Sequence, residues 1–337
     1  MSPTVKNERP GSSLLQTLSA VWSWLFLAFL LVFFEVWSRI GLGQTFLFNL
    51  NSVQSILMAS VQPLLLGLGL TFVIVAGGID LSVGFIVGLA SVIGARVMQE
   101  LGSSVPPFLG LLIGIAVALV VSVIPGLING LLIARLKVPP FIGTLGMYGI
   151  ARGFGFLSAN GVTVPVDNKV NSDFGNTNFL GIIPIPVLIT IILIFLMHYV
   201  LSQTKFGQYT YAIGGNKQAA QRAGINVERH TIGLYMLTAL MAGIAGVIYT
   251  SRFTAGAAQA GEPTLLNAIA AVVIGGASLF GGAGTIIGTV IGALIIAVID
   301  FGLVYINVSP FYQFIAVGMV IILSVLVDQS RRSVVGS

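Results

Sequence analysis

Long hydrophobic stretches alternate with short polar ones along almost the whole chain. A membrane-spanning helix needs about 20 mainly apolar residues. Ten stretches meet or approach that length and are predicted spans: 21–40, 53–76, 83–97, 108–132, 141–157, 184–201, 231–251, 265–282, 284–305 and 311–327. Four longer polar stretches remain: a tail at 1–20, a turn-rich loop at 158–183, a long loop at 202–229 and a second tail at 328–337. The pattern predicts an all-α polytopic membrane protein of about ten transmembrane helices, forming a single domain over residues 1–337.

The eighth predicted span is the least regular. Only a short apolar segment separates Thr264 from the pair Gly275-Gly276, which is typical of a broken or re-entrant helix. Extending the segment to Gly282 gives just enough length to cross. We expect a full crossing, because a re-entrant segment would place the basic pair Arg331-Arg332 outside the cell.

The basic residues are distributed unevenly between the two sides of the predicted membrane. Loops that face the cytoplasm carry an excess of Lys and Arg. With the first residue inside, the inner positions hold ten basic residues: Lys6, Arg9, Arg135, Lys137, Lys205, Lys217, Arg222, Arg229, Arg331 and Arg332. The outer positions hold five: Arg39, Arg96, Arg152, Lys169 and Arg252. The bias predicts that both termini and the 202–229 loop are cytoplasmic.

Composition supports the membrane assignment and excludes several other classes. The chain is 56% hydrophobic and only 7% charged, whereas soluble domains carry roughly 25% charged residues. Its 42 glycines suit close helix packing in a bilayer. The absence of cysteine excludes disulfides and thiolate chemistry. The net charge of +5 needs no nucleic-acid partner, because the basic residues lie where membrane topology requires them.

Within the basic loop, the stretch 214–225 predicts a short helix with defined ends. Asn216 is a good N-cap, and Gly224 suits the left-handed position that follows a helix. One side of this helix carries only alanine: Ala219, Ala220 and Ala223. About two turns cannot be stable in water alone. We therefore expect this smooth face to be held by another protein outside the bilayer.

A second short stretch, 77–84, reads Gly-Gly-Ile-Asp-Leu-Ser-Val-Gly. Its first two glycines end one helix, and Asp80 can cap the next helix from Leu81. An acid near the membrane is also a functional candidate, so both roles stay open. The stretch 275–282 shares its glycine pattern, but both would lie on the cytoplasmic side, which an inverted repeat would not give.

Three motifs together resemble those of ribose-type ABC sugar importer permeases. They are Gly77–Gly84, the pattern Gly214-Gly215-Asn216 with Ala219-Ala220 and Gly224-Ile225, and the run from Ala268 through Gly275-Gly276 and Ser278-Leu279 to Gly281-Gly282. The motifs extend over nearly the whole chain. The resemblance implies a non-catalytic permease subunit in the bacterial inner membrane. Two copies, identical or not, would form the pathway with a separate cytoplasmic ABC ATPase and a periplasmic sugar-binding protein.

The resemblance also implies roles for individual residues. The expected ATPase-coupling residues are Gly214, Gly215, Asn216, Ala219, Ala220, Arg222, Ala223, Gly224 and Ile225. The expected structural or gating residues near the pathway are Gly77, Gly78, Asp80, Ser82, Gly84, Asn129, Gly275, Gly276, Gly281 and Gly282.

Two positions depart from the family pattern. The family usually has arginine directly after the alanine pair of the loop, whereas Gln221 stands there and Arg222 follows. Before Ala268 the family shows Glu-Leu-Asp, whereas this chain has Leu265-Leu266-Asn267. The first departure puts the ion pair to the ATPase in doubt, and the second indicates a different polarity facing the outside or the substrate.

Missing motifs narrow the mechanism. The chain has no Gly-x-x-x-x-Gly-Lys-[Ser/Thr] phosphate loop, so ATP hydrolysis would need a partner. No catalytic residue, metal site or cofactor is expected, because His198 and His230 are isolated.

Other functions remain as alternatives. One is a branched-chain amino-acid permease of the same superfamily. Another is an ion-coupled secondary transporter, but its candidate acids Glu35, Asp80 and Asp300 fall nearer the span ends. An intramembrane aspartyl protease lacks the expected Tyr-Asp and Gly-x-Gly-Asp settings. The sequence does not identify the substrate among pentoses, hexoses, polyols and furanosyl signalling molecules.

Overall fold

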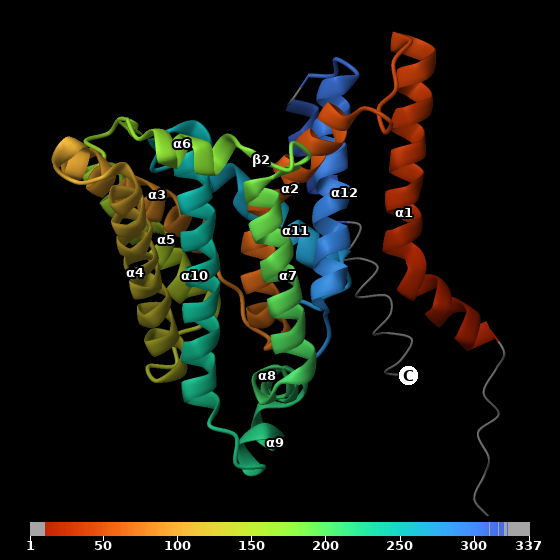
Figure 1. Ribbon diagram of the computed structural model, residues 1–337. Helices are drawn as coiled ribbons and strands as arrows, with labels where there is room; N and C mark the ends of the chain where they lie inside the picture. Colours follow the sequence, from red (N-terminus) through yellow and green to blue (C-terminus); the bar gives the residue numbers. More distant parts are fainter. Residues whose placement is uncertain (1–10, 310, 316, 320–321, 323–337) are drawn as a thin grey trace, which may run out of the picture.

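The computed structural model of the protein describes residues 11–309, 311–315, 317–319 and 322. The first half of the 1–20 tail and the whole 328–337 tail lie outside these residues, and the last predicted span, 311–327, is described only in part. The described chain is almost entirely helical, which confirms the all-α fold class (Figure 1).

In the described part of the chain, seven helices are long and apolar enough to cross a membrane. They are α1 (Gly11–Leu42, apolar over Trp22–Leu42), α2 (Leu50–Val75), α3 (Val83–Leu101), α4 (Pro107–Ala134), α7 (Ile185–Gln203), α10 (Val227–Phe253) and α12 (Ile286–Tyr305). Two more predicted spans correspond to α5 (Pro140–Ser158) and the shorter α11 (Glu262–Ile274). The total of ten spans and the cytoplasmic placement of both termini stay predictions.

The remaining elements are short and gather at the two ends of the bundle (Figure 1). They are η1 (Gly102–Ser104), β1 (Val164–Pro165), α6 (Lys169–Asn176), β2 (Asn178–Phe179), β3 (Ile183–Pro184), α8 (Lys205–Gly215), α9 (Lys217–Arg222) and β4 (Ala255–Gly256). Strand β1 pairs antiparallel with β4, and β2 with β3. We call the end that carries α8 and α9 the α9 end and the opposite one the α6 end.

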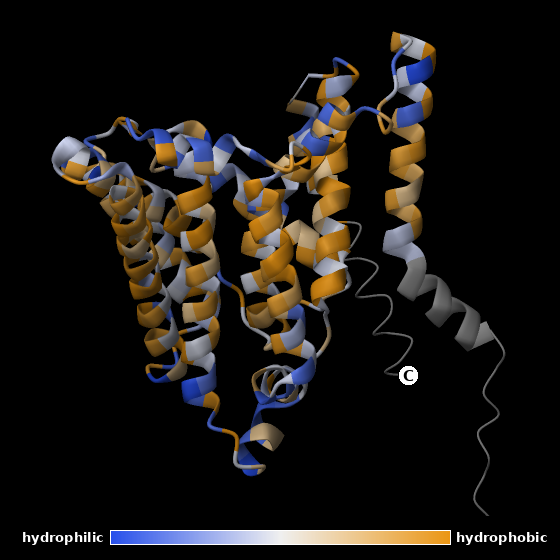
Figure 2. Cartoon of the chain, viewed as in Figure 1, coloured by the Kyte–Doolittle hydropathy of each residue, from blue (hydrophilic) through white to orange (hydrophobic). Residues whose placement is uncertain are grey.

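Helix α2 forms the centre of the bundle, and α1 stands at its edge (Figure 1). In the most apolar part of α2, 83% of residues are buried, compared with 28% in α1. Many large apolar side chains on the long helices are exposed, and Figure 2 colours these helices mostly as hydrophobic. Such apolar surfaces suit contact with lipid rather than water.

The packing of α2, α3 and α4 is repeated by α10, α11 and α12. Helix α2 packs along α12 as α10 packs along α4, and α3 packs on α4 as α11 packs on α12. The chain directions are reversed, because α2 ends at the α9 end whereas α10 begins there (Figure 1). The two halves therefore form an inverted repeat, an arrangement found in many transporters.

The sequence comparison paired the stretch 77–84 with 275–282, but the inverted repeat of the structure pairs different stretches. The counterpart of the non-helical stretch 76–82, before α3, is the stretch 254–261, before α11, not 275–282. The stretch 254–261 lies along α3. A Cβ atom placed on Gly84 would lie 2.9 Å from the Gly261 carbonyl oxygen, and one on Gly88 would lie 1.8 Å from that of Ala258.

The largest departures from the predicted span boundaries are in α1 and α11. Helix α1 begins at Gly11, inside the predicted 1–20 tail. Helix α11 is a 13-residue helix that starts at Glu262 and ends at Ile274, so the predicted crossing 265–282 is not one continuous helix. Non-helical stretches rich in small residues, 254–261 and 275–285, flank this short helix on both sides.

Candidate functional site

The short helix α9 has the ends that its sequence predicts. The side chain of Asn216 accepts a hydrogen bond from the Ala219 backbone N–H at 2.9 Å. Gly224 follows the helix with φ of 86°, in the left-handed region. The N–H of Ile225 then bonds back to the Ala220 carbonyl at 3.1 Å. Both ends are thus capped within the chain, which supports a helix of only six residues.

The predicted alanine face is only partly correct. Ala220 is buried against Ile213 and Val227, so it packs on its own chain and is not available to a partner. Ala219 and Ala223 are exposed. The difference arises because α8, which the sequence analysis missed, lies behind α9 and receives the Ala220 methyl group. The exposed surface of α9 therefore consists of Ala219 and Ala223 with the polar side chains Lys217, Gln218, Gln221 and Arg222.

Helix α8 connects α9 to the membrane helices. Its apolar and small positions Phe206, Thr210 and Ile213 fall on one face, a pattern that could have revealed it in the sequence. The Thr210 hydroxyl lies 2.9 Å from His230 Nε2, and His230 packs against the ring of Phe206. His230, isolated in the sequence, thus joins α8 to the start of α10.

Gly214, at the end of α8, touches the end of α2 and the glycine stretch 275–282. A Cβ atom there would lie 1.8 Å from the Val75 carbonyl oxygen and 2.6 Å from the Gly282 nitrogen, so only glycine fits. Nearby, the Tyr211 hydroxyl donates to the Gly284 carbonyl at 2.6 Å. Helix α8 therefore packs directly on the ends of α2 and of the 275–282 stretch.

The stretches 77–84 and 275–282 meet at this point. The Gly282 N–H donates to the Val75 carbonyl at 2.8 Å, and a Cβ on Gly281 would lie 3.0 Å from Gly77. Gly275 instead faces the start of α12, where a Cβ would lie 2.2 Å from the Gly288 carbonyl oxygen. Gly215 and Gly276 face open space. The predicted residues thus cluster at the α9 end, except Gly275 and Gly276.

Above the glycines, three polar side chains are completely buried: Asp80, Ser82 and Asn129. Asp80 Oδ1 accepts from the Ser82 N–H at 2.9 Å and from its hydroxyl at 2.6 Å. The Asn129 amide donates to the Ser82 hydroxyl at 2.9 Å and so ties α4 to this stretch. Among the described residues, Asp80 Oδ2 and Asn129 Oδ1 find no hydrogen-bond partner.

The predicted capping role of Asp80 is wrong. Helix α3 begins at Val83 rather than Leu81, and Ser82 occupies its N-cap position. Asp80 instead closes a turn within the non-helical stretch. The Tyr235 hydroxyl supports the same stretch from α10 by donating to the Ile79 carbonyl at 3.1 Å.

A cavity of about 280 Å³ separates the 77–78 backbone from α8 and α9. Its walls include Gly78, Ile133, Gly215, Asn216 and Tyr235. A hollow between the surface helices and the glycine stretch leaves room for one to shift against the other.

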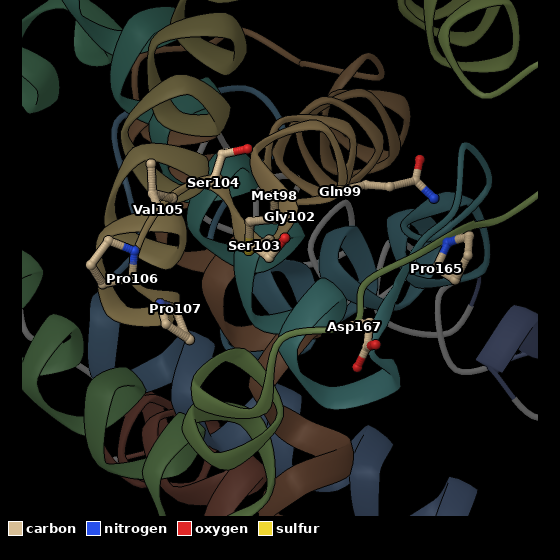
Figure 3. A pocket seen from close by; sticks show the side chains of 10 residues that line it. All are labelled: Met98, Gln99, Gly102, Ser103, Ser104, Val105, Pro106, Pro107, Pro165 and Asp167. Carbon is tan, nitrogen blue, oxygen red and sulfur yellow. The ribbon is translucent and has the colours of Figure 1, made fainter.

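The α6 end carries a larger, open hollow of about 840 Å³. One wall is the connection from α3 to α4, including Ser103 and Pro106, and the other carries Pro165 and Asp167 (Figure 3). The hollow lies at the opposite end of the bundle from α9 (Figure 1).

Comparison with known proteins identifies the family. The family described as "Branched-chain amino acid transport system / permease component" matches residues 52–325. The chain belongs to this permease family. The ribose import permease of Bacillus subtilis is 42% identical over 294 residues, covering 87% of this chain and 88% of the relative.

Other relatives of the permease are also sugar import proteins. The ribose import permease of Escherichia coli is 38% identical, covering 85% of this chain and 88% of the relative. The fructose import permease of Rhizobium meliloti is 39% identical, covering 80% and 75%. No solved structure matches the chain. These findings confirm the resemblance to ribose-type ABC permeases and a multi-pass protein of the inner membrane, and the relatives are transport subunits rather than enzymes.

Proposed function

We propose that the permease imports a monosaccharide or related polyol as the transmembrane subunit of an ABC importer. The relatives named for ribose, fructose, galactose and allose import support the substrate class. The observation that carries the mechanism is the contact of Gly214 with both Val75 and Gly282. Through this contact, a force on α9 reaches the ends of α2 and of the 275–282 stretch.

In this proposal the residues 1–337 form one permease domain, with cytoplasmic tails at 1–20 and 328–337. The 202–229 segment is the cytoplasmic coupling loop, and the exposed part of α9 binds a separate ABC ATPase. Gly214 and Gly215, with Asn216, Gly224 and Ile225, shape the loop rather than touch the ATPase. Ala219, Arg222 and Ala223 supply the contact.

Two copies of the permease enclose the pathway in this proposal. Helix α5 supports it, because Gly146, Gly149 and Gly153 lie along one exposed face, and a Cβ on any of them would meet nothing within 4 Å. Such a face allows close approach of another helix or of a solute. The hollow at the α6 end would then lie on the periplasmic side, where a sugar-binding protein delivers its ligand.

The acids do not favour an ion-coupled transporter. Each of Glu35, Asp80 and Asp300 is hydrogen-bonded within the chain: Glu35 to Arg39 and to backbone N–H groups, Asp80 to Ser82, and Asp300 to Asn267. Asn267 replaces the aspartate of the family pattern, and it donates to Asp300 at 3.2 Å where an aspartate would repel it.

Co-purification of the ATPase subunit with α9 variants tests the coupling role. Ala223→Arg adds a long charged side chain to the proposed contact, so we expect loss of ATPase binding with normal amounts of folded permease. Gln218→Arg, on the polar side, is the matched control and should retain binding. Full ATPase binding by Ala223→Arg would contradict the proposed contact. Ala220→Arg does not test it, because that substitution would disrupt the packing of α9 on its own chain.

A further inference from the structure

Two charged side chains lie on the exposed surface of the bundle, well away from its two ends. Arg152 lies about 18 Å along α5 from Pro140, at the α9 end, and about 9 Å from the other end. Glu262 begins α11 beside Gly84, which lies about 26 Å from the α6 end of α3. Both side chains are exposed, and among the described residues neither forms an ion pair.

Such side chains are incompatible with a lipid-facing surface. An unpaired charge deep in the hydrocarbon costs several kcal/mol, and intramembrane charges face water-filled cavities or the interior of a bundle. The exposed aliphatic and aromatic side chains on α7, such as Phe195, show what the lipid-facing side of this protein looks like. A water-filled space beside Arg152 and Glu262 would satisfy both charges.

Aromatic rings frame these two charges. The Phe85 and Tyr148 rings meet edge to face with centroids 4.6 Å apart. The Arg152 guanidinium lies over the Phe85 ring at 5.3 Å and over the Phe156 ring at 5.9 Å. The Tyr148 hydroxyl lies 3.5 Å from a Glu262 carboxylate oxygen. The rings hold the guanidinium in place by cation–π attraction while its N–H groups stay free to donate.

The bare glycine face of α5 runs beside this group. Tyr148, Arg152 and Phe156 follow one another at four-residue spacing, so they form a stripe along the helix. Gly149 and Gly153 are their direct neighbours and leave the backbone uncovered. A solute that moves along the glycines would therefore pass beside the side chains of Tyr148, Arg152 and Phe156.

We propose that Tyr148, Arg152 and Glu262 form a hydrogen-bonding station for the hydroxyl groups of a neutral sugar in the pathway. The guanidinium donates, the carboxylate accepts and the phenol can do both, so together they can serve several adjacent hydroxyls. The charges cancel, and the rings offer apolar faces to the C–H side of the sugar. The station rests on the proposed function, since it supplies the sugar contacts of that pathway.

Thiol labelling tests whether water reaches the station, and this test does not depend on transport activity. The chain has no cysteine, so a single introduced thiol reports one position. Gly149→Cys fits, because nothing lies within 4 Å of its Cβ. With a water-soluble, membrane-impermeant maleimide, we expect Gly149→Cys to react at least about tenfold faster than Phe195→Cys on α7, and ribose, fructose, galactose or allose to slow the reaction. Equal, slow reaction at both positions would overturn the proposal.

The same experiment distinguishes a sugar from an amino acid. A zwitterion could also pair its carboxylate with Arg152 and its ammonium group with Glu262. Protection of Gly149→Cys by leucine or valine, without protection by any sugar, would overturn the assignment of a neutral sugar.

Uptake measurements with the assembled importer complete the test. We expect Arg152→Gln and Glu262→Gln each to lower sugar uptake by about tenfold, a factor equivalent to roughly 1.4 kcal/mol, while the ATPase still co-purifies. Glu100→Gln, an exposed acid at the end of α3, is the matched control and should take up sugar normally. Normal uptake by both station variants would refute the station and leave the proposed function intact. Absence of sugar uptake by the wild type would refute the proposed function, and labelling at Gly149 would still report whether the face is wet.

Discussion

The two non-helical stretches of the inverted repeat are held by opposite means. The stretch 76–82 uses its own side chains, because Asp80 and Ser82 bond to each other and the Ser82 hydroxyl also accepts from Asn129. The stretch 254–261 is made almost entirely of alanine and glycine, and its neighbours supply the polar groups. Ser91 bonds to both the N–H and the carbonyl of Ala257.

The difference shows two ways in which one architecture can supply hydrogen-bond partners to the backbone of a non-helical stretch inside a membrane. Buried backbone polar groups need partners wherever the helix is interrupted. At the α9 end, the partners are side chains that also tie α3 to α4 beneath the coupling loop. At the other break, small residues let the chain descend along α3 and bring Glu262 to the exposed surface of the bundle.

The largest effect is expected from Gly88→Ala. Its Cβ would lie 1.8 Å from the Ala258 carbonyl oxygen, so the 254–261 stretch could not stay against α3. We expect a loss of more than about 3 kcal/mol in stability, visible as a lower melting temperature and a lower yield of monodisperse protein in detergent. Gly149→Ala, with open space around its Cβ, is the control and should not be destabilised. A Gly88→Ala protein as stable as the wild type would show that the 254–261 stretch does not pack on α3 as described.

Substitutions at Asp80 should produce an intermediate effect that depends on the new side chain. Asp80→Ala leaves the Ser82 N–H and hydroxyl without their acceptor, at a cost of about 1–3 kcal/mol. Asp80→Asn keeps that acceptor and replaces the unpartnered Oδ2 with a donor, so its melting temperature should stay close to that of the wild type. If both variants lost equal stability, the carboxylate charge itself, rather than its hydrogen bonds, would hold the stretch.

The smallest of these effects is expected for Ser91→Ala, which removes both bonds to Ala257 but leaves the small-residue packing in place. We expect a loss of about 1 kcal/mol, measured by the same thermal unfolding. A loss as large as that of Gly88→Ala would mean that polar partners, not close packing, hold the second stretch as they do the first.

The sequence predicted the features that depend on local chemistry. Asn216 and Gly224 end α9 as expected, because capping involves only neighbouring residues. Most predicted spans also lie close to real helices, since length and hydropathy decide them.

Features that depend on distant contacts were missed or misjudged. Nothing local shows that Ala220 points inward, because the burial comes from Ile213 and Val227. In the sequence, the two halves were compared through the glycine stretches 77–84 and 275–282. The true second break, 254–261, has small residues without a motif, and only its packing on α3 reveals it. Asp80 looked like a cap because the sequence does not show that Asn129, 47 positions from Ser82 in the chain, binds the Ser82 hydroxyl and so helps to fix this stretch.

ATP-driven uptake in proteoliposomes tests the central claim most directly. The permease would be reconstituted with and without the cognate ABC ATPase, with the sugar-binding protein and labelled ribose, fructose, galactose and allose outside. The account predicts accumulation of at least one of these sugars only when the ATPase and ATP are both present. Accumulation by the permease alone, or ATP-dependent accumulation of leucine but of none of the sugars, would contradict it.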